Sequence, residues 1–127
     1  MTGPIALGDL DGDGALDLVA AEGTAVRIAI NRGDGLLEDR TGDAPALPAA
    51  AVRIAVGDLD GDCSDEIAIL ADDGSVTVLT RDARGALVAL DRPTGEAVEI
   101  AILDPRGDGA RELALVRAGG SVTLWRP

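Results

Sequence analysis

Residues 5–18 read Ile-Ala-Leu-Gly-Asp-Leu-Asp-Gly-Asp-Gly-Ala-Leu-Asp-Leu, and this phrase decides the fold because the chain repeats it. A second copy begins at Ile54, 49 residues after the first, and a degenerate third copy begins at Ile100, 46 residues after the second. A repeat of this length is typical of a propeller or a solenoid, in which each copy is one supersecondary unit. The chain is therefore expected to consist of three copies of one small structural unit.

Each copy contains short runs that favour β-strands. They are rich in β-branched and aliphatic residues, about five residues long, and separated by glycine-containing turns. The expected strands are residues 16–20, 26–30 and 36–38 in the first copy and 66–70, 76–80 and 87–90 in the second. With the strand before the acidic loop, each copy has four short antiparallel strands, the pattern of a propeller blade. Helix is disfavoured because 17 glycines interrupt the chain.

The expected fold class is therefore all-β, with three propeller blades in one domain of residues 1–127. The blades are expected at about 4–45, 51–92 and 97–127, the last without its fourth strand, and residues 41–51 connect the first two. Closed propellers have at least about four blades. Two alternatives remain open: the chain is part of a longer propeller, or copies associate, for example as two halves of a six-bladed ring.

Composition excludes several classes of function. The 127 residues include 23 acidic and 11 basic residues, all arginine, for a net charge of −12, and no histidine. Histidine-dependent catalytic triads are therefore absent, and the single cysteine, Cys63, excludes an internal disulfide. Such an acidic surface repels nucleic acid and anionic lipid. No apolar stretch is long enough for a membrane span, and the N-terminus does not resemble a signal peptide. Cations are the expected partners.

The first acidic loop has the spacing of a calcium site. Counting from Asp9, carboxylates occupy positions 1, 3, 5 and 9, namely Asp9, Asp11, Asp13 and Asp17, and Ala15 at position 7 can offer its backbone carbonyl. Calcium takes six to eight oxygen ligands, which a tight loop with alternate carboxylates supplies. A solvated Asp-Gly turn is the alternative. We expect one Ca²⁺ in this loop.

The second copy carries the corresponding candidates Asp58, Asp60, Asp62, Ser64 and Glu66. Cys63 replaces the glycine at position 6, so the turn is expected to be strained if that position needs a positive φ. We expect a second, more weakly bound Ca²⁺ here, which gives two calcium ions per chain.

The third copy departs from this pattern. It keeps Asp104, Asp108 and Glu112, but position 3 is Arg106. A guanidinium beside three carboxylates can neutralise them in place of an ion. The third loop is therefore expected to be free of metal and pinned by Arg106.

Residues 8–18, their second copy, and the turn Asn31-Arg32-Gly33-Asp34-Gly35 resemble the FG-GAP/VCBS repeat family, the calcium-loop blades of β-propellers like those of integrin α-subunits. The resemblance implies Ca²⁺ in the loop between the first two strands of a blade and a closed ring of blades. It also implies an extracellular or periplasmic protein that binds a protein or carbohydrate ligand. The chain departs from the family in having Trp125 as its only aromatic residue.

These observations predict a non-enzymatic, calcium-binding module with a structural or adhesion role, in which the ions stabilise the acidic loops. The alternative is a fragment or subunit of a polysaccharide-active propeller enzyme. Without histidine, lysine or tyrosine, such an enzyme would depend on carboxylates, arginine or a metal-bound water.

Overall fold

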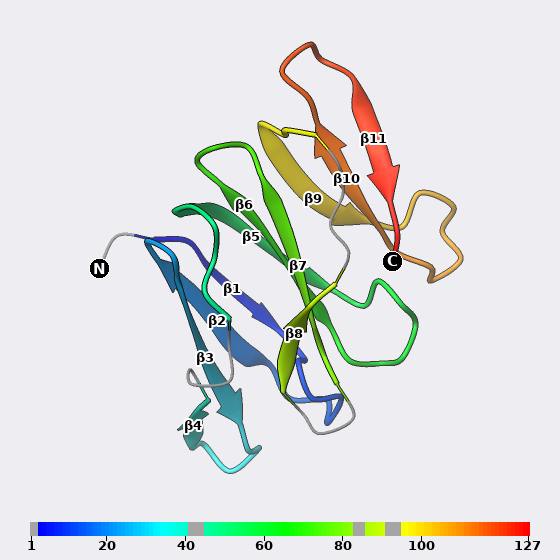
Figure 1. Cartoon of the computed structure of the whole chain (residues 1–127). Coiled ribbons are helices and arrows are strands. Elements are labelled where there is room, and N and C mark those ends of the chain that lie inside the picture. Colours follow the sequence, from blue (N-terminus) through cyan, green and yellow to red (C-terminus); the bar gives the residue numbers. More distant parts are fainter. Residues whose placement is uncertain (1–2, 41–44, 83–85, 91–94) are drawn as a thin grey trace.

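The computed structural model describes residues 3–40, 45–82, 86–90 and 95–127, and within them eleven strands form three antiparallel sheets (Figure 1). The first sheet contains β1 (Ile5–Gly8), β2 (Asp17–Glu22), β3 (Ala25–Asn31) and β4 (Leu37–Asp39). The second contains β5 (Ala51–Gly57), β6 (Glu66–Ala71), β7 (Val76–Arg81) and β8 (Leu87–Ala89). The third contains β9 (Glu99–Leu103), β10 (Glu112–Val116) and β11 (Val122–Trp125).

Each sheet is a simple meander in which consecutive strands are neighbours. The first strands, β1, β5 and β9, lie next to one another, and the sheets follow one after the other like consecutive propeller blades (Figure 1). The expected all-β class is confirmed. None of the described residues forms a helix, so this part of the chain offers no helix that could cross a membrane.

The second sheet is covered on both faces, which explains why β6 is buried along its whole length. Ile67, Ile69 and Leu79 pack against the first sheet, where they meet Val19 and Ile28. The opposite face packs against the third sheet through a separate cluster: Leu59, Ala68, Leu70, Val76, Val78, Ala97, Ile100, Leu113 and Leu115. Burial on two faces requires apolar residues at successive positions, which is the near-continuous pattern of residues 66–70.

A glycine at the end of a first strand allows neighbouring sheets to approach closely. A Cβ on Gly8 would lie 2.2 Å from Cγ1 of Val56, and a Cβ on Gly57 would lie 2.8 Å from Cγ2 of Ile102. The corresponding residue of the third sheet is Leu103, which carries a side chain at this point. The glycine before the acidic loop therefore serves packing between the first and second, and the second and third, sheets.

The connection predicted at residues 41–51 lies partly outside the described residues, which resume at 45, and the turn expected at 83–85 lies outside them entirely. Leu47 is buried in the first core, and its N–H donates to the carbonyl of Thr24 (2.9 Å). The N–H of Ala51, where β5 begins, donates to the carbonyl of Gly23 (2.9 Å). These bonds hold the connection against the β2–β3 turn.

Candidate metal centres

The three acidic loops join the first and second strands of their sheets and have positive φ at the same two positions. In each loop, positions 4 and 6 have positive φ: Gly12 (77°) and Gly14 (86°), Gly61 (79°) and Cys63 (71°), and Gly107 (66°) and Gly109 (86°). Glycine adopts this region without the steric cost that a Cβ imposes. The loop conformation is therefore encoded mainly by the alternate glycines.

The first aspartate of each loop accepts hydrogen bonds from the turn that it opens. Oδ1 of Asp9 accepts from the N–H groups of Gly12 (2.9 Å) and Asp13 (3.1 Å), and Oδ2 accepts from that of Gly14 (2.9 Å). Asp58 accepts from the three corresponding amides at 2.8–3.2 Å. This carboxylate therefore holds the curl of the loop together.

The carboxylate at position 9 connects the loop to the third strand. Asp17 is fully buried; its Oδ2 accepts from the N–H of Leu10 (2.7 Å) and its Oδ1 from the N–H of Asn31 (2.8 Å) at the end of β3. Glu66, equally buried, accepts from the N–H groups of Leu59 (2.7 Å) and Asp60 (3.1 Å). Sequence reasoning identified these two residues as candidate ligands but missed this structural role.

Four carboxylates converge in the second loop. Asp58, Asp60, Asp62 and Glu66 each place one oxygen so that all four lie within 4.8 Å of one another. Calcium–oxygen distances are about 2.3–2.6 Å, so oxygens on opposite sides of one ion are about 5 Å apart. The all-oxygen donor set and its spacing therefore fit Ca²⁺.

The first loop brings three candidates together in the same way: Asp9, Asp11 and Asp17. Asp13 is outside this group, and its Oδ1 accepts from the N–H of Ala15 (2.9 Å). The corresponding bond of the second loop joins the N–H of Ser64 to Asp62 (2.9 Å). Ala15, expected to offer its backbone carbonyl, and Ser64, the corresponding candidate, thus occupy equivalent places in the two turns.

Burial and crowded negative charge disturb the titration of these groups. Burial raises the pKa of Glu66 to about 7, and the charges of Asp60 and Asp62 act in the same direction. The pKa of Asp11 is raised to about 6, mainly by burial and then by its hydrogen bond with Asp13. The pKa of Asp60 is also raised, chiefly by burial. A bound cation would stabilise the ionised forms of these carboxylates.

Cys63 is the one residue other than glycine with positive φ in the described part of the chain. We expect Cys63→Gly to raise the free energy of unfolding by about 1 kcal/mol, because it relieves a left-handed strain of about 1–2 kcal/mol against a smaller entropic cost. Urea unfolding in the presence of a chelator measures the change. Cys63→Ala, which keeps the Cβ, is the control, and an equal gain in that variant would contradict the explanation.

The third loop keeps the backbone hydrogen bonds to its first aspartate but lacks those to a carboxylate at position 9. Asp104 accepts from the N–H groups of Asp108 (3.2 Å) and Gly109 (2.6 Å), and such backbone bonds lower its pKa. Position 2 is Pro105, which has no N–H to donate to a carboxylate at position 9. Of the carboxylate bonds that hold the first two loops, the third loop therefore keeps those of its first aspartate.

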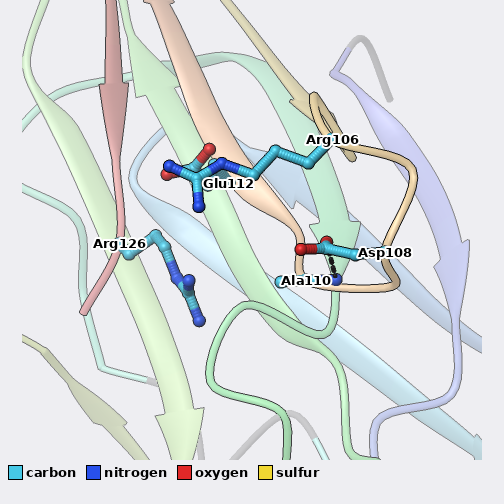
Figure 2. A pocket seen from close by; sticks show the side chains of 5 residues that line it. All are labelled: Arg106, Asp108, Ala110, Glu112 and Arg126. Carbon is cyan, nitrogen blue, oxygen red and sulfur yellow. Dashed lines mark hydrogen bonds between the residues drawn. The ribbon is translucent and has the colours of Figure 1, made fainter.

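Within the described residues, Arg106 does not form the expected ion pair with the carboxylates of the third loop. It lines a small pocket with Asp108, Ala110, Glu112 and Arg126, with the two guanidinium groups entering from different segments (Figure 2). The ion pairs within the described residues do not include Arg106. The predicted pairing of Arg106 with the loop carboxylates is thus not observed.

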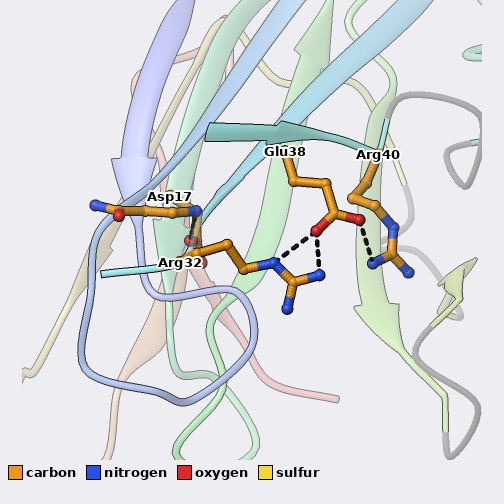
Figure 3. A network of polar contacts seen from close by, with 5 residues as sticks. Asp17, Arg32, Glu38 and Arg40 are labelled. Carbon is orange, nitrogen blue, oxygen red and sulfur yellow. Dashed lines mark hydrogen bonds and ion pairs between the residues drawn. The ribbon is translucent and has the colours of Figure 1, made fainter. Parts of the chain in front are cut away.

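The arginine that follows β3, Arg32, forms its ion pair at the outer edge of the first sheet. Arg32 donates from Nε to Oε2 of Glu38 on β4 (2.6 Å), and Arg40 pairs with Oε1 of the same carboxylate (3.5 Å; Figure 3). The turn between them is fixed locally, because the N–H of Gly33 donates to Oδ1 of Asn31 (2.8 Å). Glu38 therefore organises the outer edge of the first sheet.

Asp65 forms a connection that sequence reasoning did not identify. Its N–H donates to the carbonyl of Asp9 (2.8 Å), and its Oδ2 accepts from the N–H of Asp9 (2.9 Å). Burial raises the pKa of Asp65. The only signal in the sequence is an acidic residue at position 8, where the other copies have Leu16 and Arg111.

Consecutive antiparallel sheets with an acidic loop between their first two strands define a propeller-type repeat protein. Residues 9–69 match the family model described as FG-GAP-like repeat, which confirms the resemblance over this stretch. The match begins at the first loop and ends within β6. Comparisons with curated proteins and with solved structures gave no match. Repeats of this family are typically extracellular and non-enzymatic.

Proposed function

We propose that the chain is a calcium-binding propeller module without catalytic activity, which acts in adhesion or in binding a protein or carbohydrate outside the cytoplasm. The observation that carries the calcium assignment is the second loop, where four carboxylate oxygens lie within 4.8 Å of one another. The adhesion role and the location are supported by the family match to residues 9–69.

The protein residues divide the work in each loop. The first aspartate holds the turn, and the carboxylate at position 9 fixes the loop to the sheet through buried backbone bonds. In each of these carboxylates at least one oxygen accepts a single hydrogen bond and keeps a lone pair for a ligand bond. When bound, calcium would neutralise the crowded carboxylates and add bonds between the first and second strands. The third loop is proposed to remain metal-free, because Arg106 replaces the acidic residue at position 3.

Calorimetric titration of chelator-stripped protein with Ca²⁺ tests the assignment, with Mg²⁺ as the comparison. We expect two sites per chain with Kd values of about 10⁻⁴–10⁻³ M, the range of extracellular modules. At 10 mM Ca²⁺ each site would stabilise the fold by about 1.4–2.7 kcal/mol.

The variants Asp60→Ala and Glu112→Gln sharpen this test. Asp60→Ala is expected to leave one site, whereas Glu112→Gln in the third loop is expected to retain both. Absence of binding at 10 mM Ca²⁺ would overturn the calcium assignment, and loss of a site in Glu112→Gln would show that the third loop binds metal.

A further inference from the structure

We propose that Asp65 is a positioning residue that makes the first two loops bind calcium cooperatively; this inference rests on the proposed calcium function. Asp65 and Asp9 exchange two hydrogen bonds, one from each N–H, at 2.8 and 2.9 Å. The two residues are 56 positions apart and belong to different sheets. The loops are therefore joined directly, through the main chain of Asp9 and both the main chain and the carboxylate of Asp65.

The two hydrogen bonds join residues that lie at, or next to, a candidate calcium ligand in each loop. Asp9 is the first carboxylate of the first loop, and both polar groups of its main chain are held by Asp65. Asp65 immediately precedes Glu66, the carboxylate at position 9 of the second loop. Any ligand that fixes Glu66 also restricts Asp65, and through it the backbone that aims the carboxylate of Asp9.

Packing fixes the position of Asp65 further. A Cβ on Gly8 would lie 2.9 Å from Oδ2 of Asp65, so the carboxylate is seated against the backbone immediately before Asp9. A side chain at residue 8 would displace it. We call the two hydrogen bonds between Asp65 and Asp9 the clamp. Because Gly8 leaves room for the carboxylate of Asp65, movement of either loop shifts the other through the clamp.

The first and second loops are connected in this way, whereas the second and third loops are not, within the described residues. Within the described residues, the hydrogen bonds between loops of different sheets are those of Asp65 and Asp9. Position 8 of the third loop is Arg111, and position 8 of the first is Leu16, which is 57% exposed. Coupling is therefore expected between the two loops that are the calcium candidates.

Positive cooperativity follows from shared ordering. The ion that binds first orders both ends of the clamp, so the second ion finds its loop already restrained and binds with a smaller entropic cost. Couplings between sites in proteins commonly change affinity by about 5- to 150-fold. For a single pair of hydrogen bonds we expect the low end of that range, about 5- to 10-fold.

Single-site variants measure the coupling. Asp60→Ala leaves the first loop, Asp11→Ala leaves the second, and neither change touches the clamp. The product of the two stepwise calcium association constants of the unmodified chain is divided by the product of the two single-site constants. This ratio is expected to be about 5–10 and is unity for independent sites.

The same ratio is then measured with residue 65 changed. Asp65→Ala removes the acceptor for the N–H of Asp9 but keeps the bond from the N–H of residue 65 to the carbonyl of Asp9, so the ratio is expected to fall towards one. Asp65→Asn keeps an acceptor oxygen at Oδ1, so the ratio is expected to remain near that of the unmodified chain. A ratio that is lost in Asp65→Ala and retained in Asp65→Asn would therefore be due to the acceptor oxygen and not to a general loss of stability. Amide hydrogen exchange gives a second readout: Ca²⁺ in the second loop of Asp11→Ala should slow exchange at Asp9.

The outcomes separate the two proposals. If the unmodified chain binds no calcium, the proposed function and the coupling both fall. If it binds two ions with a ratio of one, only the coupling falls, and this holds even if Asp65→Ala does not fold. A ratio that is unchanged in a folded Asp65→Ala protein would assign the coupling to other contacts and overturn the role of Asp65.

Discussion

Replacing Asp17 with alanine is expected to lower the free energy of unfolding of the calcium-free protein by about 3–5 kcal/mol. Both oxygens of this fully buried carboxylate accept backbone hydrogen bonds, from Leu10 and from Asn31. Alanine leaves two N–H groups without their acceptor and also opens a cavity. Small domains are stable by only about 5–15 kcal/mol, so this is a large fraction of the total. Urea unfolding followed by circular dichroism, in chelator, measures it.

Two further variants make the result specific. Asp17→Asn retains one acceptor oxygen and is expected to lose less, about 1–3 kcal/mol. Asp13→Ala removes an exposed carboxylate that accepts only from the turn within its own loop, including Ala15, and is expected to cost about 1 kcal/mol or less. If Asp17→Ala cost no more than Asp13→Ala, the buried bonds would not have the structural role assigned to them.

The calcium-free protein is expected to become more stable as the pH falls from 8 to 5. Burial raises the pKa of Glu66 from 4.5 to about 7, so the folded chain binds this proton at a higher pH than the unfolded chain. The contribution is therefore fully present below about 4.5 and is lost as the pH rises through about 7. A shift of this size corresponds to about 3 kcal/mol, and Asp11, with a pKa of about 6, acts in the same direction.

Urea unfolding at pH 5, 6, 7 and 8 in chelator tests this dependence. Glu66→Gln removes the titrating group and should flatten the trend, whereas Glu112→Gln, the matched change in the third loop, should leave it intact. Saturating calcium should oppose the trend, because the ion and the proton compete for the same carboxylate. An identical slope in Glu66→Gln and in the unmodified chain would contradict the assignment of the pH dependence to this residue.

Local pattern accounts for most of the secondary structure. The strands expected at residues 26–30 and 76–80 appear as β3 and β7, and the weak fourth strands appear as β4 and β8. Strand alternation and glycine turns are properties of a few consecutive residues, so they can be read from one sequence. The same is true of the loops, where the strain expected at Cys63 is confirmed by its positive φ.

The candidate metal sites could be predicted only in part from the sequence. Spacing identified the carboxylates that converge in the two loops, but Asp13 lies outside its group and Arg106 forms no ion pair within the described residues. Whether a side chain turns into a loop or away from it depends on the curvature of the backbone and on competing donors. Sequence spacing by itself does not specify either.

The sequence by itself determined the repeat, the all-β class and the acidic loops, because these follow from periodicity, glycine placement and residue type over short distances. Tertiary structure alone decided that Asp17 and Glu66 fasten their loops to the sheets, that Gly8 admits the neighbouring sheet, and that Asp65 joins two loops. These features depend on which backbone groups meet after the sheets pack face to face. That packing brings Asp65 against Asp9, although 56 residues separate them in the chain.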